Sequence, residues 1–350
     1  MQIVHTLKNL ITINLALDMG TTTTRIHLRG KGVELNEPTC IAVSHRTGDL
    51  VCVGGEAYRL MGRCPPYVEV TYPLRQGVVQ DFDLAELMLR RFMAGLFRTQ
   101  ALFGARMVMV VPTAATDVEA KAFEDLALQV GAREVHLVEA PVAAALGLSL
   151  HLDKRRGAVA VYLGGGTTQA AVFSGGELIA THCVRVGGQD INESIASGVR
   201  KKYGVQVGHQ TIEQLKTTLG SAFPIEKDEA REVYGKDVLD GLPKAVFVSN
   251  WEIREMLLSP IERIVGSVKA VLERIPPELA EDVKKYGITL SGGTALLRGM
   301  NKLVEKVTGV ECTVPRKSTL ACLSGAEKIV SDVKRHRRFL YSRHSRSLSG

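Results

Sequence analysis

Small and hydroxyl-bearing residues form two short segments that could bind phosphate. The first follows Asp18, the second follows Tyr162, and both are rich in glycine and threonine. Small residues let backbone N–H groups approach an anion closely, and threonine hydroxyls add further donors. Each segment therefore predicts a phosphate-binding turn, and two such turns in one chain can clamp a polyphosphate. The predicted phosphate-contacting residues are Gly20, Thr21, Thr22 and Thr23 in the first segment and Gly164, Gly165, Gly166 and Thr167 in the second.

The residues around each segment predict the elements that hold it. Apolar side chains alternate through residues 13–17 and 26–28, and again through 159–163 and 171–173. Alternation on both sides of a short polar turn is typical of a β-hairpin. A single turn of this kind would most simply be an ordinary tight hairpin, but the repetition favours anion binding. It also predicts two related halves of one fold.

A third small-residue turn follows an apolar run at residues 288–290. It consists of Ser291, Gly292, Gly293 and Thr294, and Ala295 begins the next segment. This position predicts a loop between a strand and a helix start, where an anion can also bind. The sequence contains neither a Walker loop nor a GxGxxG fingerprint, which counts against P-loop and Rossmann folds.

Length and composition indicate an ordinary soluble protein with more than one domain. The chain has 350 residues, of which 45% are hydrophobic and 23% charged, and domains usually contain roughly 100–200 residues. No apolar run approaches the roughly 18 residues of a membrane span, and no secretory signal is recognisable, so we expect a cytoplasmic protein. The six cysteines include no CxxC pair, which favours free thiols over a metal site.

The positive charge of the chain is concentrated at its end. The formal net charge is +7, and residues 334–350 contain six basic and no acidic residues. The rest of the chain is almost neutral. A protein that coats nucleic acid is therefore not expected.

These motifs resemble those of the actin-like ATPase superfamily, and within it the MreB family of bacterial actin homologues. Residues 18–22 resemble the first phosphate motif, 164–168 the second, 139–141 the connecting motif and 291–294 the adenosine motif. Further MreB-like stretches lie at residues 32–38, 81–83, 131–135, 186–188 and 276–280. The resemblance covers nearly the whole chain, from about Ile13 to about Lys328.

The resemblance implies an α/β actin-like fold with two related domains, each a β-sheet flanked by helices, and a nucleotide cleft between them. Domain I would span residues 13–155 with a small insertion at about 32–75. Domain II would span 156–333 with an insertion at about 189–254, and 334–350 would be a basic, disordered tail. Local patterns add a capping box at Asp83 and Glu86, a buried strand at 107–111 and an alanine-rich helix after Val138.

The resemblance also implies a function and a set of site residues. A family member would bind ATP or ADP with Mg²⁺, form filaments on the inner face of the cytoplasmic membrane, and contribute to cell shape and wall growth. Its partners would be further copies of itself, the wall-elongation machinery and other MreB-like chains. Asp18 would orient Mg²⁺ and the phosphates, and Thr167 would position water. The adenosine-contacting residues would be Glu213, Gln214, Leu215, Lys216, Gly292, Gly293, Thr294 and Ala295.

Three expected acids are absent from the catalytic motifs. Tyr162 stands where the first turn has Asp18, and a phenol is neutral at pH 7. Ala140 stands where MreB-like sequences usually carry the glutamate that orients the attacking water, and Gln169 replaces another glutamate. These changes predict weak or lost ATP hydrolysis. Compensated slow hydrolysis, an active MreB and a chaperone-like ATPase remain alternatives; a sugar kinase would need a carboxylate base in the cleft.

Two apolar segments and the basic tail are candidates for membrane contact. Ile3, Val4, Leu7, Leu10 and Ile11 recur at helical spacing on one face, which predicts an amphipathic anchor or, equally, a short helix packed on the body. Leu102 and Phe103 stand where MreB-like proteins carry a membrane-inserting loop. The tail from Lys334 to Arg346 would add attraction to anionic lipid.

Overall fold

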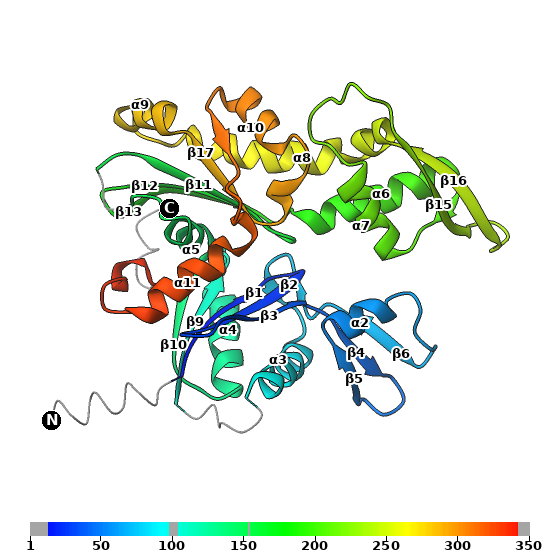
Figure 1. The fold of residues 1–350 in the computed structure, drawn as a ribbon, viewed down its shortest axis with the longest axis horizontal. Helices are drawn as coiled ribbons and strands as arrows, with labels where there is room; N and C mark the ends of the chain where they lie inside the picture. Colours follow the sequence, from blue (N-terminus) through cyan, green and yellow to red (C-terminus); the bar gives the residue numbers. More distant parts are fainter. Residues whose placement is uncertain (1–12, 98–103, 153–154, 342–350) are drawn as a thin grey trace. The chain divides into compact units, whose positions relative to one another are not determined.

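The computed structural model describes residues 13–97, 104–152 and 155–341, and the chain divides into two compact units. Unit 1 contains residues up to Leu150 together with those from Leu320 onwards, and unit 2 is His151–Thr319. Figure 1 shows both units coloured along the sequence.

Unit 1 is built on a five-stranded sheet in the order β10-β9-β1-β2-β3. The predicted first hairpin is confirmed, because β1 pairs antiparallel with β2, while β9 and β10 continue the sheet in parallel on the other side. The strands are β1 (Asn14–Met19), β2 (Thr23–Leu28), β3 (Gly32–Pro38), β9 (Ala105–Val111) and β10 (Ala132–Glu139). The predicted buried strand at 107–111 lies in β9, in which six of seven residues are buried.

Unit 2 repeats this topology in the order β13-β12-β11-β17-β18. The hairpin of β11 and β12 is antiparallel, and β17 and β18 follow in parallel. The strands are β11 (Ala158–Leu163), β12 (Thr168–Ser174), β13 (Glu177–Val184), β17 (Ile288–Ser291) and β18 (Cys312–Thr313). The two sheets have the same strand order relative to their hairpins, which confirms the two related halves predicted from the repeat.

Each unit also carries a small three-stranded sheet. In unit 1 the order is β5-β4-β6, with a short β7–β8 ladder nearby in the sequence, and in unit 2 it is β14-β15-β16. The bounds are β4 (Ile41–Ser44), β5 (Leu50–Val53), β6 (Val68–Thr71), β7 (Leu74–Arg75), β8 (Val78–Val79), β14 (Val205–Gln206), β15 (Ala230–Asp237) and β16 (Pro243–Ser249). Both small sheets fall within the expected insertions, but residues 32–38 belong to the main sheet as β3.

Helices pack around these sheets (Figure 1). Buried apolar side chains form a large core in each unit. Unit 1 has α2 (Gly55–Leu60), α3 (Phe82–Leu96), α4 (Asp117–Gln129), α5 (Ala140–Gly147), α11 (Ala321–Ser331) and the 3₁₀ turn η3 (Arg337–Phe339). Unit 2 has α6 (Gly188–Tyr203), α7 (His209–Thr218), α8 (Asn250–Leu272), α9 (Pro277–Tyr286), the 3₁₀ turn η1 (Thr294–Leu296) and α10 (Met300–Thr308). The 3₁₀ turn η2 (Ser318–Leu320) lies where unit 2 ends and the chain re-enters unit 1.

Two boundaries differ from the sequence-based expectation. Helix α3 begins after Asp81, whose side chain accepts a hydrogen bond from the Leu84 N–H at 3.0 Å, so the expected capping box at Asp83 and Glu86 is wrong. The C-terminal boundary also differs, because α11 belongs to unit 1, where it packs on α5. Lys328 of α11 donates to the carbonyl of Leu146 at 2.7 Å. The expected division had placed residues 320–333 in the second domain.

In the described part of the chain, no helix is both long enough and apolar enough to cross a membrane.

Candidate functional site

The first turn, between β1 and β2, is fixed by backbone and threonine hydrogen bonds. The Gly20 N–H donates to the Thr23 carbonyl at 3.0 Å. Thr39 donates its hydroxyl to the Gly20 carbonyl at 2.7 Å, and the Thr21 hydroxyl accepts from the Gly77 N–H at 2.9 Å. Segments distant in sequence therefore hold this turn in one conformation, as an anion-binding turn requires.

Asp18 lies at the end of β1 and is paired across the hairpin with Arg25 of β2. The Arg25 Nη1 atom is 3.6 Å from the Asp18 Oδ2 atom, and the Asp18 residue is only 4% exposed. Burial raises the pKa of the Asp18 carboxyl, and the Arg25 guanidinium opposes that rise. Arg25 was not predicted from the sequence, although hairpin pairing around the turn would have placed it near Asp18.

The second turn, between β11 and β12, has the same internal hydrogen bond. The Gly164 N–H donates to the Thr167 carbonyl at 2.8 Å, as Gly20 does to Thr23. The start of α6 closes over this turn, because the Gly188 N–H donates to the Gly164 carbonyl and the Gln189 N–H to the Gly165 carbonyl. A Cβ atom on Gly187 would lie 2.7 Å from the Gly165 carbonyl oxygen, so this close approach requires glycine.

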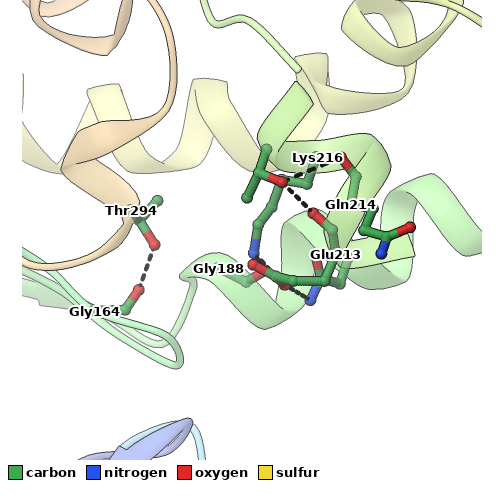
Figure 2. A network of polar contacts seen from close by, with 8 residues as sticks. Gly164, Gly188, Glu213, Gln214, Lys216 and Thr294 are labelled. Carbon is green, nitrogen blue, oxygen red and sulfur yellow. Dashed lines mark hydrogen bonds and ion pairs between the residues drawn. The ribbon is translucent and has the colours of Figure 1, made fainter. Parts of the chain in front are cut away.

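The third turn lies against the second within unit 2. The Thr294 hydroxyl donates to the Gly164 carbonyl at 2.8 Å (Figure 2). Gly292 has a φ of +88°, and a Cβ there would lie 2.2 Å from the Leu163 carbonyl oxygen. The predicted loop between strand and helix is present, although it leads first into the 3₁₀ turn η1. Gly293 is exposed beside Thr294, and the Ala295 side chain is buried.

A polar cluster joins α6 to α7 in the same unit (Figure 2). Lys216 donates to the Glu213 carboxylate at 2.7 Å, and the Asn192 amide donates to the same oxygen at 2.7 Å. Lys216 also contacts the Gly188 carbonyl at 3.5 Å, which links the cluster to the helix that closes the second turn. Within the predicted segment, Gln214 is exposed, whereas Leu215 is buried in the core of unit 2. Asn192 was not predicted from the sequence.

The positions with missing acids have neutral side chains in the structure. Tyr162 is paired with Gln169 across the second hairpin, in the register that Asp18 and Arg25 occupy in the first. Gln169 is buried and donates to the Thr167 hydroxyl at 2.9 Å. Ala140 is the first residue of α5 and is only 3% exposed. Of these three positions, Tyr162 could be compared between the two halves from the sequence alone, whereas Ala140 and Gln169 required the family resemblance.

The residues predicted to contact a membrane at Ile3, Val4, Leu7, Leu10, Ile11, Leu102 and Phe103 lie outside the described residues. Of the basic tail, residues 334–341 are described. Lys334, Arg335, Arg337 and Arg338 are exposed there. This part is fixed to unit 1 by Tyr341, whose N–H donates to the Leu137 carbonyl at 2.8 Å. The expected disorder is therefore wrong for residues 334–341, which include the 3₁₀ turn η3.

Comparison with known proteins identifies the family. The model of the family described as "MreB/Mbl protein" matches residues 12–338. The chain belongs to the MreB/Mbl family. It is 36% identical over 334 residues to the cell shape-determining protein MreB of Escherichia coli strain K12, with 94% of this chain and 96% of the relative covered.

Solved structures support the same fold. MreB5 of Spiroplasma citri, in crystal structures bound to AMPPNP and to ADP, is 28% identical and superposes with TM-scores of 0.88 and 0.87, covering 93% of this chain and 98% of that one. The MamK double helical filament is 18% identical, with a TM-score of 0.76 and coverage of 92% and 99%. The expected actin-like α/β fold, with two related sheets flanked by helices, is confirmed.

Proposed function

We propose that the chain is an MreB-type cytoskeletal protein that binds ATP and ADP, assembles into filaments and contributes to cell shape, with weak or absent ATP hydrolysis. The observation that carries this proposal is the pair of matching turns. Both hairpins close with the same Gly-to-Thr backbone bond, and both belong to sheets of the same topology.

Nucleotide binding is supported by the turns and by the relatives. Small residues at Gly20, Gly164 and Gly165 leave room for phosphate oxygens close to the backbone. The Glu213–Lys216 cluster stands beside the second and third turns and offers polar groups to a nucleoside. MreB5 of Spiroplasma citri, which shares this fold, has been crystallised with AMPPNP and with ADP.

Weak hydrolysis is supported by the side chains at the catalytic positions. Phosphoryl transfer depends on positioned charge and a positioned water rather than on covalent chemistry. Tyr162, Gln169 and Ala140 offer no carboxylate at the three positions where the family resemblance implies one. Loss of a single positioning group commonly lowers a rate by about 10²–10³. A fully active ATPase remains the alternative function.

Family membership supports the proposals for filament formation, the cellular location and the partners. Filaments would be open-ended, because head-to-tail contacts between identical subunits do not close unless the rotation allows it. We place the filaments on the inner face of the cytoplasmic membrane, in contact with the wall-elongation machinery and with other MreB-like chains. The basic residues at 334–338 support an anionic surface as one binding partner.

Three measurements on the purified full chain test this function. Calorimetry with ATP and ADP measures binding, phosphate release measures turnover, and sedimentation with electron microscopy detects filaments. We expect binding of both nucleotides, filaments, and phosphate release at least about 10²-fold slower than in an MreB that retains its acids. Absence of any nucleotide binding contradicts the proposal, and rapid phosphate release supports the active ATPase instead.

A further inference from the structure

Arg25, the third residue of β2, places a guanidinium beside Asp18, which lies two residues before Gly20 of the first turn. It pairs with Asp18 across the β1–β2 hairpin, and its side chain is only 15% exposed. The Arg25 Nη1 atom lies 3.6 Å from the Asp18 Oδ2 atom. The Arg25 Nε atom is buried and has no hydrogen-bond partner among the residues that the structure describes. The guanidinium therefore keeps donors that its ion pair does not use.

The side chains paired next to the two hairpin turns fit a bound Mg²⁺ poorly, because they supply a single carboxylate and that carboxylate is already paired with Arg25. This ion is held in proteins by oxygen ligands, usually one or two carboxylates together with phosphates and water. Among the four side chains paired at these two positions, Asp18 alone is a carboxylate. It already faces the positive charge of Arg25, which would repel a metal cation. The corresponding pair in the second hairpin, Tyr162 and Gln169, carries no formal charge at neutral pH.

A guanidinium suits a phosphate better than the available ligands suit a divalent cation. It is permanently charged, and its donors form a planar fork that matches phosphate oxygens. Arg25 is held at the turn by the strand register and by the Asp18 carboxylate, which limits the entropy that it would lose on binding an anion.

We propose that Arg25 supplies the positive charge for the nucleotide phosphates at the first turn, so that nucleotide binding does not require Mg²⁺. This inference rests on the proposed nucleotide-binding function and deepens it. It replaces the expectation that Asp18 holds the metal with a role for Asp18 as the residue that orients Arg25. The competing explanation is that Arg25 only neutralises Asp18 within the fold.

The experiment compares ADP binding in EDTA with ADP binding in excess Mg²⁺, by calorimetry on the full chain. For the unchanged protein we expect affinities that differ by less than about threefold. Arg25→Gln should weaken binding in EDTA by about 10-fold or more, because a charge-assisted contact contributes roughly that much. Arg29→Gln is the matched control, since Arg29 is exposed just after the same strand, and it should leave binding unchanged.

Each outcome decides the inference. A wild-type affinity that falls by more than about 10-fold in EDTA overturns it while the nucleotide-binding function stands. Equal binding by Arg25→Gln and the wild type in EDTA also overturns it and supports a merely structural ion pair. If Arg25→Gln does not fold, two tests remain. The variant Arg25→Lys keeps the positive charge but lacks the planar fork of donors. The comparison of wild-type binding in EDTA and in Mg²⁺ needs no variant. Failure to bind ADP in either buffer contradicts the proposed function itself.

Discussion

Asp18 and Tyr162 occupy equivalent positions in two related hairpins but offer opposite chemistry. Each lies one residue before the end of its strand and faces the second strand, Asp18 opposite Arg25 and Tyr162 opposite Gln169. A carboxylate paired with a guanidinium makes the first position ionic, while the second is neutral at pH 7. Both turns nevertheless share the Gly-to-Thr backbone hydrogen bond, which does not depend on these side chains. The proposed nucleotide binding and the proposed loss of hydrolysis therefore rest on different groups of the site.

Restoring the missing acids should raise hydrolysis. We expect the double variant Ala140→Glu, Tyr162→Asp to release phosphate from ATP about 10- to 100-fold faster than the wild type, because two positioning carboxylates return. Steady-state phosphate release measures this. Tyr162→Phe is the control that removes the hydroxyl without adding charge, and its rate should stay at the wild-type value.

The double variant needs a check of folding, since Ala140 is buried at the start of α5. Circular dichroism and thermal unfolding provide it. A folded double variant with the wild-type rate would show that these two positions do not limit turnover.

At the scale of single residues, the sequence predicts some site residues well and others not at all. The repeat allowed Asp18 and Tyr162 to be compared without any structure, since both stand at the same place before a turn. Asn192 could not be predicted, because it reaches Glu213 from a different helix, 21 residues away. Arg25 needed the register of a hairpin, and a shift of one residue would have turned its side chain to the other face of the sheet.

Helices α5 and α11 pack so closely that glycine is required at their contact. A Cβ atom on Gly325 of α11 would lie 1.8 Å from the Ala143 carbonyl oxygen of α5. A Cβ on Gly147 of α5 would likewise lie 1.9 Å from the Ala321 carbonyl oxygen. Since both obstacles are backbone atoms, the helices would have to move apart. This contact keeps the C-terminal segment in unit 1.

Gly325→Ala should therefore destabilise unit 1. We expect the free energy of unfolding to fall by about 3 kcal/mol, at the upper end of overpacking costs. Gly266→Ala is the matched control, because Gly266 is exposed in the middle of α8 and an added Cβ meets nothing within 4 Å. There we expect a gain of about 0.5–1 kcal/mol from helix propensity. Urea unfolding monitored by circular dichroism measures both, and equal effects would refute the packing argument.

The start of α8 is stabilised by Glu252, the third residue of the helix. Its carboxylate accepts from the Ser249 N–H at 2.7 Å and from the Tyr203 hydroxyl at 2.5 Å, and it contacts the Lys202 ammonium at 2.5 Å. Burial alone would raise the pKa of this carboxyl, but the hydrogen bonds outweigh burial and lower the pKa from 4.5 to about 2. Glu252 therefore ties α8 to the end of α6.

The stabilisation by Glu252 should depend on pH. Because the folded pKa lies below the unfolded value, the contribution is complete above about pH 4.5 and is lost as the pH falls towards 2. At pH 7 we expect Glu252→Gln to lower the free energy of unfolding by about 2 kcal/mol, and the difference from wild type to shrink at pH 3.5. Urea titrations at the two pH values measure it. The exposed Glu255→Gln is the control, and a pH-independent difference at Glu252 would contradict the assignment.

Strands were easier to predict than helix boundaries. The hairpins and the buried strand β9 follow from apolar alternation and from a continuous apolar run, which tertiary packing reinforces. The start of α3 was misplaced because Asp81 and Asp83 can both cap a helix, and only the backbone shows which one accepts the Leu84 N–H.

At the scale of the whole molecule, the chain leaves unit 1 after Leu150 and returns to it at Leu320. The sequence did not predict this return. The residues that let α11 pack on α5 are alanines and glycines, which carry no distinctive sequence signal. The return carries the basic tail back to unit 1, where Tyr341 bonds to the Leu137 carbonyl and its hydroxyl to Asp117 at 3.2 Å. Four exposed basic side chains thus occupy a defined place on that unit.

Neutralising these four residues should weaken attachment to an anionic surface. We expect the variant with glutamine at positions 334, 335, 337 and 338 to bind vesicles containing phosphatidylglycerol at least about 10-fold more weakly, since each basic residue near such a surface contributes roughly 1 kcal/mol. Co-sedimentation at low salt measures this, and added salt should reduce the difference because it screens the charges.

A matched control distinguishes the effect of where the basic residues lie from the effect of the net charge of the chain. Glutamine at Lys201, Lys302, Arg316 and Lys317 removes the same four charges from exposed positions on unit 2. If the place of the tail matters, this control should bind the vesicles almost as well as the wild type. Equal losses in both variants would mean that the net charge of the chain governs attachment. Unchanged binding by the tail variant would leave the apolar segments, around Leu7 and at Phe103, as the membrane contacts to test next.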